Sequence, residues 1–201
     1  MASDNLKKLL PRKQAYQKLG ISTDAFIVGT ISNLYRNKGL SYLLNAANKI
    51  IDKNVKIIIV GNDKGLSELE SEKKKLDNII KKNNLKNKII LTGYISNAAE
   101  LLNAFDIYVC SSTKEGMPYS ILEAMQAGLP IVSTNVGAIS GILDDNKNGL
   151  LVEPKNVDEL AKKINYLIKN PSEMKRLGDN AKEKVKQFSL NKMITETEKL
   201  Y

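Results

Sequence analysis

The sequence predicts an α/β fold in which a parallel sheet of about six strands is covered by helices on both faces. Three observations support this prediction. Short apolar runs recur along the chain, segments with helical periodicity separate them, and the composition of 42% apolar and 26% charged residues is ordinary for a globular domain. Strand, helix and strand repeated in this way form right-handed βαβ units, which build a parallel sheet.

The short apolar runs are expected to be buried strands. They occupy residues 26–31, 55–60, 88–91, 106–110, 130–133 and 149–152. In sheets of this kind, ligands bind at the carboxyl ends of the strands. We therefore expect the chemistry of this protein in the loops that follow these runs.

Helices are expected wherever apolar residues recur every three or four positions. This spacing runs from Leu40 to Ile51, more loosely from Leu66 to Ile80, from Ala98 to Phe105, and from Val157 to Ile168. A further helix should start at Pro171, with Asn170 as its N-cap. At the two ends of the chain, the first 20 or so residues predict a helix that ends at Gly20, and Ser189 is expected to cap a last helix.

Composition excludes several kinds of chemistry. The chain has one cysteine, Cys110, and no histidine, so an internal disulfide, a histidine-ligated zinc and a Ser–His–Asp triad are all excluded. We expect Cys110 to be a buried small apolar residue. No metal site is expected. Neither a membrane-spanning stretch nor the apolar core of a signal peptide is found, so we expect a cytoplasmic protein.

The net charge of +9 suggests an anionic partner. However, the lysines are interleaved with acidic residues, and the eleven aromatic residues do not alternate with basic ones as a base-stacking surface requires. No nucleic-acid partner is therefore expected. Solvated helix faces account for most of this charge, and the remainder would suit a phosphate-bearing ligand or peripheral contact with an anionic membrane surface.

The segment from Cys110 to Pro130 carries the richest set of functional groups. A strand ends near Cys110, a loop with two serines and a threonine follows, and Pro118 fits the first turn of a helix that Gly128 ends. Free N–H groups near residues 117–120, together with the helix dipole, would form an anion site. Two carboxylates, Glu115 and Glu123, bracket this helix start.

Composition alone leaves two interpretations of these carboxylates open. Glu115 and Glu123 are either ordinary exposed acids of a helix, or they accept hydrogen bonds from sugar hydroxyls beside a bound phosphate. Seven residues separate the two glutamates, which lie in the segments Glu-Gly-Met-Pro and Leu-Glu-Ala-Met. This arrangement resembles the E-x7-E signature of glycosyltransferase family 4, whose members are retaining enzymes of the GT-B fold. The segments 134–137, 148–154 and 188–201 also match that family's pattern, and the resemblance extends from about Phe26 to the last residue.

This resemblance implies a role for each residue of the motif. Glu123 would bind the ribose hydroxyls of a nucleotide, and Glu115 would contact hydroxyls of the donor sugar and act in catalysis. The backbone of Gly116, Met117 and Pro118 would border the sugar and the diphosphate, although Pro118 has no N–H to donate.

A second motif follows the first strand. Family members carry Gly-Arg-Leu, three residues and Lys-Gly, with the arginine and the lysine on the diphosphate. Lys38 matches that lysine and is expected to act in catalysis, whereas Ser32 and Asn33 occupy the glycine and arginine positions. Arg36 lies near enough in sequence to replace the arginine.

Glycines after the second and third strands form a weaker signal. Such glycines often serve only as turns. By the resemblance, Gly61 would lie near the wall of the ligand crevice, and Gly93, Tyr94 and Ile95 would lie beside the nucleobase.

The resemblance implies a Rossmann-like domain that is the carboxyl-terminal half of a GT-B enzyme. Residues 1–22 would be an interdomain linker helix, 23–187 the nucleotide-sugar-binding domain, and 188–201 a helix that crosses to an acceptor-binding domain missing from this chain. The intact enzyme would transfer a hexose from a nucleoside-diphosphate sugar to a glycan, lipid or other acceptor, without a metal or other cofactor, and this chain alone would be inactive. The alternative is a non-catalytic nucleotide- or sugar-phosphate-binding module. A NAD-dependent oxidoreductase is disfavoured because no G-x-G-x-x-G follows the first strand.

Overall fold

The computed structural model describes residues 9–21, 25–52 and 54–188, and it contains a parallel sheet. The strands are β1 (Phe26–Ile31), β2 (Val55–Val60), β3 (Ile89–Gly93), β4 (Ile107–Cys110), β5 (Ile131–Thr134) and β6 (Leu150–Val152). Their order across the sheet is β3-β2-β1-β4-β5-β6, and every neighbouring pair is parallel. The predicted sheet is therefore confirmed, with boundaries that differ from the predicted ones by one or two residues.

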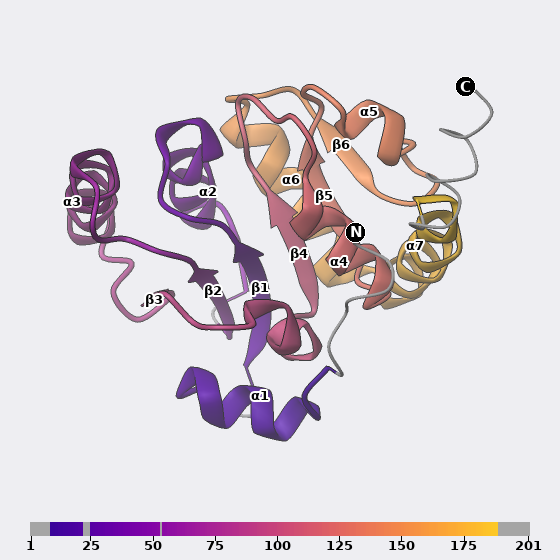
Figure 1. The fold of residues 1–201 in the computed structure, drawn as a ribbon, viewed down its shortest axis with the longest axis horizontal. Coiled ribbons are helices and arrows are strands. Elements are labelled where there is room, and N and C mark those ends of the chain that lie inside the picture. Colours follow the sequence, from indigo (N-terminus) through magenta and orange to yellow (C-terminus); the bar gives the residue numbers. More distant parts are fainter. Residues whose placement is uncertain (1–8, 22–24, 53, 189–201) are drawn as a thin grey trace, which may run out of the picture.

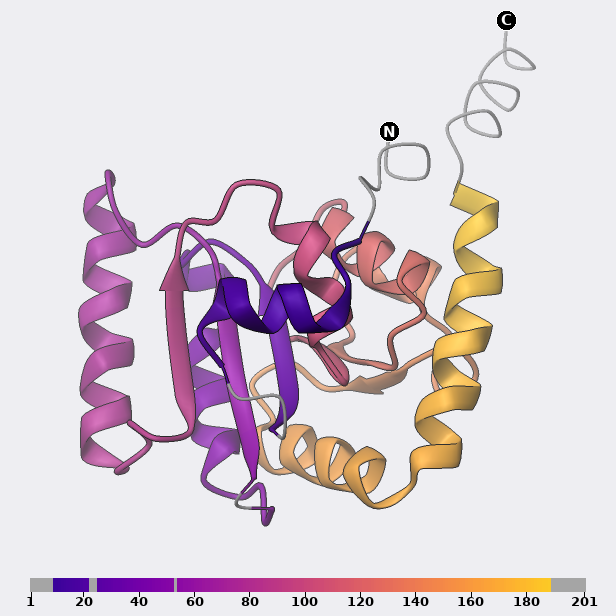
Figure 2. The same ribbon diagram turned by 90° about the horizontal axis from the view of Figure 1, so that it is seen from below.

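Helices cover both faces of this sheet (Figure 1). One face packs against α2 (Leu40–Ala47), α3 (Ser67–Lys82) and α6 (Val157–Lys169). The other packs against α1 (Arg12–Leu19), the 3-10 helix η2 (Ala98–Ala104), α4 (Tyr119–Gln126) and α5 (Ile139–Ile142), with contributions from α7 (Pro171–Lys184) and the 3-10 helix η3 (Val185–Phe188). Figure 2 shows α3 and α7 at opposite ends of the molecule. Each face thus has its own apolar core.

The helix at the amino-terminal end is packed into one of these cores. Ala15, Tyr16 and Leu19 of α1 are buried, and α1 packs against η2. Arg12 forms an ion pair with Asp106 at 2.8 Å. Gly20 ends α1 in the left-handed conformation (φ +64°), as predicted. The division of the chain at residues 22 and 187 stays a prediction, and the predicted helix after Ser189 lies outside the described residues.

The structure corrects three local predictions. The segment that starts at Ala98 is a 3-10 helix, which is the form that short connections often take. The helix from Leu40 ends at Ala47, so Ile51 is not on its buried face and is 71% exposed. Asn170 precedes Pro171 as expected, but its side chain donates to the Tyr166 carbonyl at 2.7 Å and does not cap α7.

The strand order reverses between β1 and β4, and this reversal matters for ligand binding. The chain leaves β1 toward β2 on one side, whereas β4 and β5 lie on the other side of β1. At such a reversal the loops that follow the two central strands diverge, and a crevice opens at their carboxyl ends. The loops after β1 and β4 are those that carry the two sequence motifs.

Candidate functional site

Two loops meet at the carboxyl ends of β1 and β4. In the loop after β4, the Thr113 N–H donates to the Asn37 carbonyl at 2.7 Å, and the Ser111 hydroxyl donates to the Lys38 carbonyl at 3.0 Å. Gly39 allows this approach, because a Cβ at its position would lie 2.1 Å from the Ser111 carbonyl oxygen. The loop after β1 ends in the 3-10 helix η1 (Arg36–Lys38), which is thereby fixed against β4.

This contact between the loops brings Lys38 and Glu115 together. The Lys38 ammonium lies 2.7 Å from Oε1 of Glu115, and the Ser112 hydroxyl donates to the same oxygen at 2.6 Å. The Glu115 side chain is only 8% exposed and that of Lys38 is 27% exposed. A carboxylate so far from water is stabilised by its cation and its hydroxyl donor, so the three side chains form one unit.

A third loop fixes the backbone on which Glu115 lies. The Thr134 hydroxyl, at the end of β5, donates to the Ser112 carbonyl at 2.6 Å. Gly137 in the following loop has φ +57°, and a Cβ there would lie 1.9 Å from the Glu115 carbonyl oxygen. The position of Glu115 therefore depends on three neighbouring loops, those after β1, β4 and β5.

Glu123 has a different environment. It lies within α4 and is half-buried, and the structure gives its carboxylate no hydrogen bond or ion pair with another described residue. Burial raises the pKa of the Glu123 carboxyl above its ordinary value. A desolvated carboxylate without donors is suited to accept hydrogen bonds from a ligand, so Glu115 and Glu123 differ in environment as well as in place.

A cavity of about 430 Å³, the crevice cavity, lies next to the Lys38–Glu115 pair. The predicted residues among those that line it are Ser32, Asn33, Lys38, Gly61, Tyr94 and Ile95. A smaller hollow continues from it toward Ser112 and Glu115, and Ser32 and Lys38 line both. The tertiary structure thus brings together residues from the loops after β1, β2, β3 and β4.

Two glycines that the sequence singled out have structural roles here. A Cβ on Gly61 would lie 2.0 Å from the Ser32 carbonyl oxygen, so this glycine lets the loops after β1 and β2 touch. Gly93 ends β3 in the left-handed conformation (φ +72°) and turns the chain toward Tyr94 and Ile95. Gly93 itself is not among the residues that line the crevice cavity.

Asn33 and Arg36, the two residues considered for the place of the family's arginine, have different environments in the structure. The Asn33 side chain accepts a hydrogen bond from the Asn62 N–H at 2.9 Å, so it joins two loops. Arg36 is exposed, and its side chain lines neither the crevice cavity nor the smaller hollow. In the part of the chain that the structure describes, therefore, Lys38 is the cation at the crevice, and Arg36 lies outside it.

The start of α4 provides fewer free donors than expected. The Tyr119 N–H already donates to the Met117 carbonyl at 3.0 Å, and Pro118 has no N–H. Gly116 is exposed, and a Cβ at its position would meet no atom within 4 Å, whereas Met117 is 49% exposed and Pro118 is buried. None of these three residues lines the crevice cavity or the smaller hollow, so their predicted contact with the sugar and the diphosphate stays a prediction.

Sequence reasoning missed the role of Ser112. Its position three residues before Glu115, in the loop that follows a strand, was the available signal. Cys110 is buried, and burial raises the pKa of its thiol, as expected for a small apolar residue. Tyr35, Ala98 and Ser120 also line the site without having been predicted.

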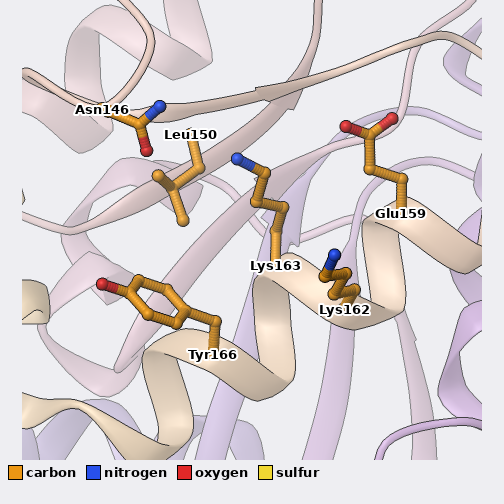
Figure 3. Close-up of a pocket in the computed structure, with 6 residues that line it drawn as sticks. All are labelled: Asn146, Leu150, Glu159, Lys162, Lys163 and Tyr166. Atoms are coloured by element: carbon orange, nitrogen blue, oxygen red, sulfur yellow. The ribbon is translucent and has the colours of Figure 1, made fainter.

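Another cavity, of about 360 Å³, lies along α6 at the β6 edge of the sheet and is drawn in Figure 3. Lys162, Lys163 and Tyr166 of α6 line it, and it shares no lining residue with the crevice cavity. None of the candidate binding or catalytic residues predicted from the sequence lines it. Across the ranges that the structure describes, no helix is long and apolar enough to cross a membrane.

Comparison with solved structures identifies the same fold. The structure of Alr3699/HepE from Anabaena in complex with UDP and glucose superposes with a TM-score of 0.87 at 28% identity, over 96% of this chain and 53% of that one. The carboxyl-terminal domain of LpcC, a glycosyl transferase group 1 family protein from Francisella tularensis, superposes with a TM-score of 0.79 at 27% identity, over 93% of this chain and 97% of that one.

Sequence comparison agrees with the structural comparison. A glycosyltransferase of Methanocaldococcus jannaschii of uncharacterized function, MJ1178, is 36% identical over 82% of this chain and 44% of its own length. The poly(ribitol-phosphate) alpha-N-acetylglucosaminyltransferase of Staphylococcus aureus is 32% identical over 79% of this chain and 31% of its own length. This chain thus spans less than half the length of either relative. The family profile described as "Glycosyl transferases group 1" matches residues 11–184, and the chain belongs to that family.

Proposed function

We propose that this chain is the donor-binding half of a retaining glycosyltransferase of family 4. The intact enzyme would transfer a hexose from a nucleoside-diphosphate sugar to a glycan, lipid or other acceptor. One observation carries the proposal: the Lys38–Glu115 pair lies at the reversal of the sheet, beside the crevice cavity. The half-buried Glu123 of α4, which has no donor of its own among the described residues, supports it. The UDP bound to Alr3699/HepE supports a nucleotide as part of the ligand.

Each of the three charged residues would contact a different part of the donor. Glu123 would accept hydrogen bonds from the ribose diol, and Glu115 would accept them from hydroxyls of the transferred sugar. Lys38 would contact the diphosphate, on which negative charge accumulates as the glycosidic bond breaks. A fixed ammonium aimed at that charge lowers the barrier as an oxyanion hole does, and the reaction proposed here uses no metal.

Half of the enzyme is expected to be absent from this chain. The two relatives named above are each more than twice as long as the region that this chain matches. The acceptor would bind mainly to a second domain. We therefore expect the chain to bind a donor without transferring its sugar. The net charge of +9 also supports peripheral contact of the whole enzyme with an anionic membrane, which sedimentation with anionic and neutral vesicles would test.

The donor can be identified by saturation-transfer NMR against UDP-, GDP- and ADP-sugars, followed by calorimetry. We expect one nucleotide to bind with a Kd of roughly micromolar to millimolar, as suits half of a site. Binding of none of them would contradict the proposal. Acceptor-dependent transfer by this chain alone would contradict the expected need for a second domain.

The alternative, a non-catalytic nucleotide-binding module, predicts a different result. Such a module would bind the nucleoside diphosphate and its sugar equally well in both the wild type and Glu115→Gln, because no part of the site would have to recognise the sugar. A donor-binding site should lose affinity for the nucleotide-sugar in Glu115→Gln and keep its affinity for the diphosphate.

A further inference from the structure

The two hydrogen bonds to the Glu115 carboxylate end on one oxygen. Oε1 receives the Lys38 ammonium at 2.7 Å and the Ser112 hydroxyl at 2.6 Å. The structure gives Oε2 no donor from any described residue. The carboxylate is thus held by one oxygen and turned so that the other is left for a further donor.

The two groups on Oε1 are not equivalent. The Lys38 side chain is 27% exposed and would contact the diphosphate, so its contact with Glu115 is shared with a ligand. Ser112 is only 2% exposed and its hydroxyl already donates to Glu115, so a bound sugar would not compete for it. A contact that the ligand does not compete for can hold the carboxylate throughout binding.

The backbone of Ser112 is itself fixed. Its carbonyl accepts the Thr134 hydroxyl at 2.6 Å, and its hydroxyl lies 3.5 Å from the Cys110 sulfur. The residue lies between a strand that ends at Cys110 and the loop that carries Glu115, so it cannot move without disturbing the sheet. The hydroxyl is therefore a rigid donor in a buried place.

From this geometry we infer that Ser112 is a positioning residue for donor-sugar recognition. Its hydroxyl fixes the rotamer of Glu115 so that Oε2 faces the hydroxyls of the transferred sugar. Fixing a free glutamate side chain costs conformational entropy, and Ser112 removes that cost before the donor binds. The inference rests on the proposed function, because it takes Glu115 as the group that recognises the sugar.

The test compares Ser112→Ala with Ser133→Ala in titrations of this chain with UDP and UDP-glucose. Ser133 is an equally buried serine whose hydroxyl donates to the Thr134 carbonyl at 3.1 Å, so it controls for the loss of a buried hydroxyl. We expect Ser112→Ala to weaken the affinity for UDP-glucose about tenfold and to change the affinity for UDP less than about twofold, because only binding of the sugar depends on Glu115. Ser133→Ala should change neither. Equal losses for UDP and UDP-glucose in Ser112→Ala would overturn the inference.

A double-mutant cycle asks whether Ser112 acts through Glu115. In a Glu115→Gln background, Ser112→Ala should cause no further loss of UDP-glucose affinity. A second tenfold loss there would mean that the two residues act independently, and the inference would fail.

A crystal structure of Ser112→Ala separates this inference from the proposed function, since it needs no ligand. We expect the Glu115 carboxylate to leave its present rotamer. An unmoved carboxylate would overturn the positioning role even if UDP-glucose binds. A wild-type chain that binds neither UDP nor UDP-glucose would instead count against UDP-glucose as donor, with the crystal structure still deciding the role of Ser112.

Discussion

Replacement of Gly137 by alanine should disturb both the stability of the domain and the place of Glu115. Gly137 has φ +57°, and its Cβ would lie 1.9 Å from the Glu115 carbonyl oxygen. The left-handed conformation costs an alanine about 1–2 kcal/mol, and relief of the overlap by a shift of backbone costs about 1–3 kcal/mol more. The free energy of unfolding should therefore fall by roughly 2–5 kcal/mol.

Gly20 provides a matched control for the backbone part of this cost. It has φ +64°, but a Cβ there would have no atom within 4 Å. Gly20→Ala should cost only the conformational part, about 1–2 kcal/mol. The difference of about 1–3 kcal/mol corresponds to a Tm lower by roughly 2–12 °C in Gly137→Ala than in Gly20→Ala for a domain of this size.

Calorimetric unfolding measures the Tm of the two variants, and a titration measures their affinity for UDP-glucose. Gly137→Ala should also bind UDP-glucose more weakly than Gly20→Ala, because the displaced loop is the one that carries Glu115. Equal Tm values in the two variants would refute the reasoning, since they would mean that the overlap with the Glu115 carbonyl is relieved without cost.

Three further predictions concern the charged residues. Lys38→Ala should lose about 1.5–3 kcal/mol of UDP affinity in calorimetry, the range for a hydrogen bond to a charged group, whereas the exposed Lys86→Ala should lose none. Arg36→Ala should leave UDP affinity unchanged, since Arg36 does not line the crevice cavity, and a loss like that of Lys38→Ala would show that Arg36 replaces the family arginine. Glu123→Gln should weaken UDP and UDP-glucose equally by about 1–2 kcal/mol, and it should raise the Tm at pH 7. Burial raises the pKa of Glu123, so the folded state holds its proton more tightly than the unfolded state, and stability falls as pH rises from the ordinary carboxyl pKa through the raised one. The Tm advantage of Glu123→Gln should therefore disappear in acid, and an advantage that persists unchanged below the ordinary carboxyl pKa would contradict this explanation.

The strands were the most predictable part of the fold. A parallel strand is buried on both faces, so it appears in the sequence as a short continuous apolar run such as Val55–Val60. Helix type and helix ends were less predictable. Ala98 and the residues after it have helical spacing, but this spacing does not distinguish an α-helix from the 3-10 helix that they form. Asn170 hydrogen-bonds back into the preceding helix instead of capping the next.

The candidate site was predictable as a set of residues and unpredictable as an arrangement. The spacing of Glu115 and Glu123 and the position of Lys38 pointed to the loops that meet at the crevice. The local sequence did not indicate that Glu115 is held by two donors, or that Glu123 is half-buried with a raised pKa. That difference depends on burial and on partners contributed by other strands.

The sequence by itself determined that this chain forms a parallel α/β sheet, that its functional groups follow the strands, and that its motifs belong to a glycosyltransferase family. Only the tertiary structure decided which groups meet. Lys38 and Glu115 are 77 residues apart and touch because β1 and β4 are neighbours in the sheet. Local apolar patterns fix where strands form, but strand order is set by the packing of the whole chain, and the contacts at the crevice follow from that order.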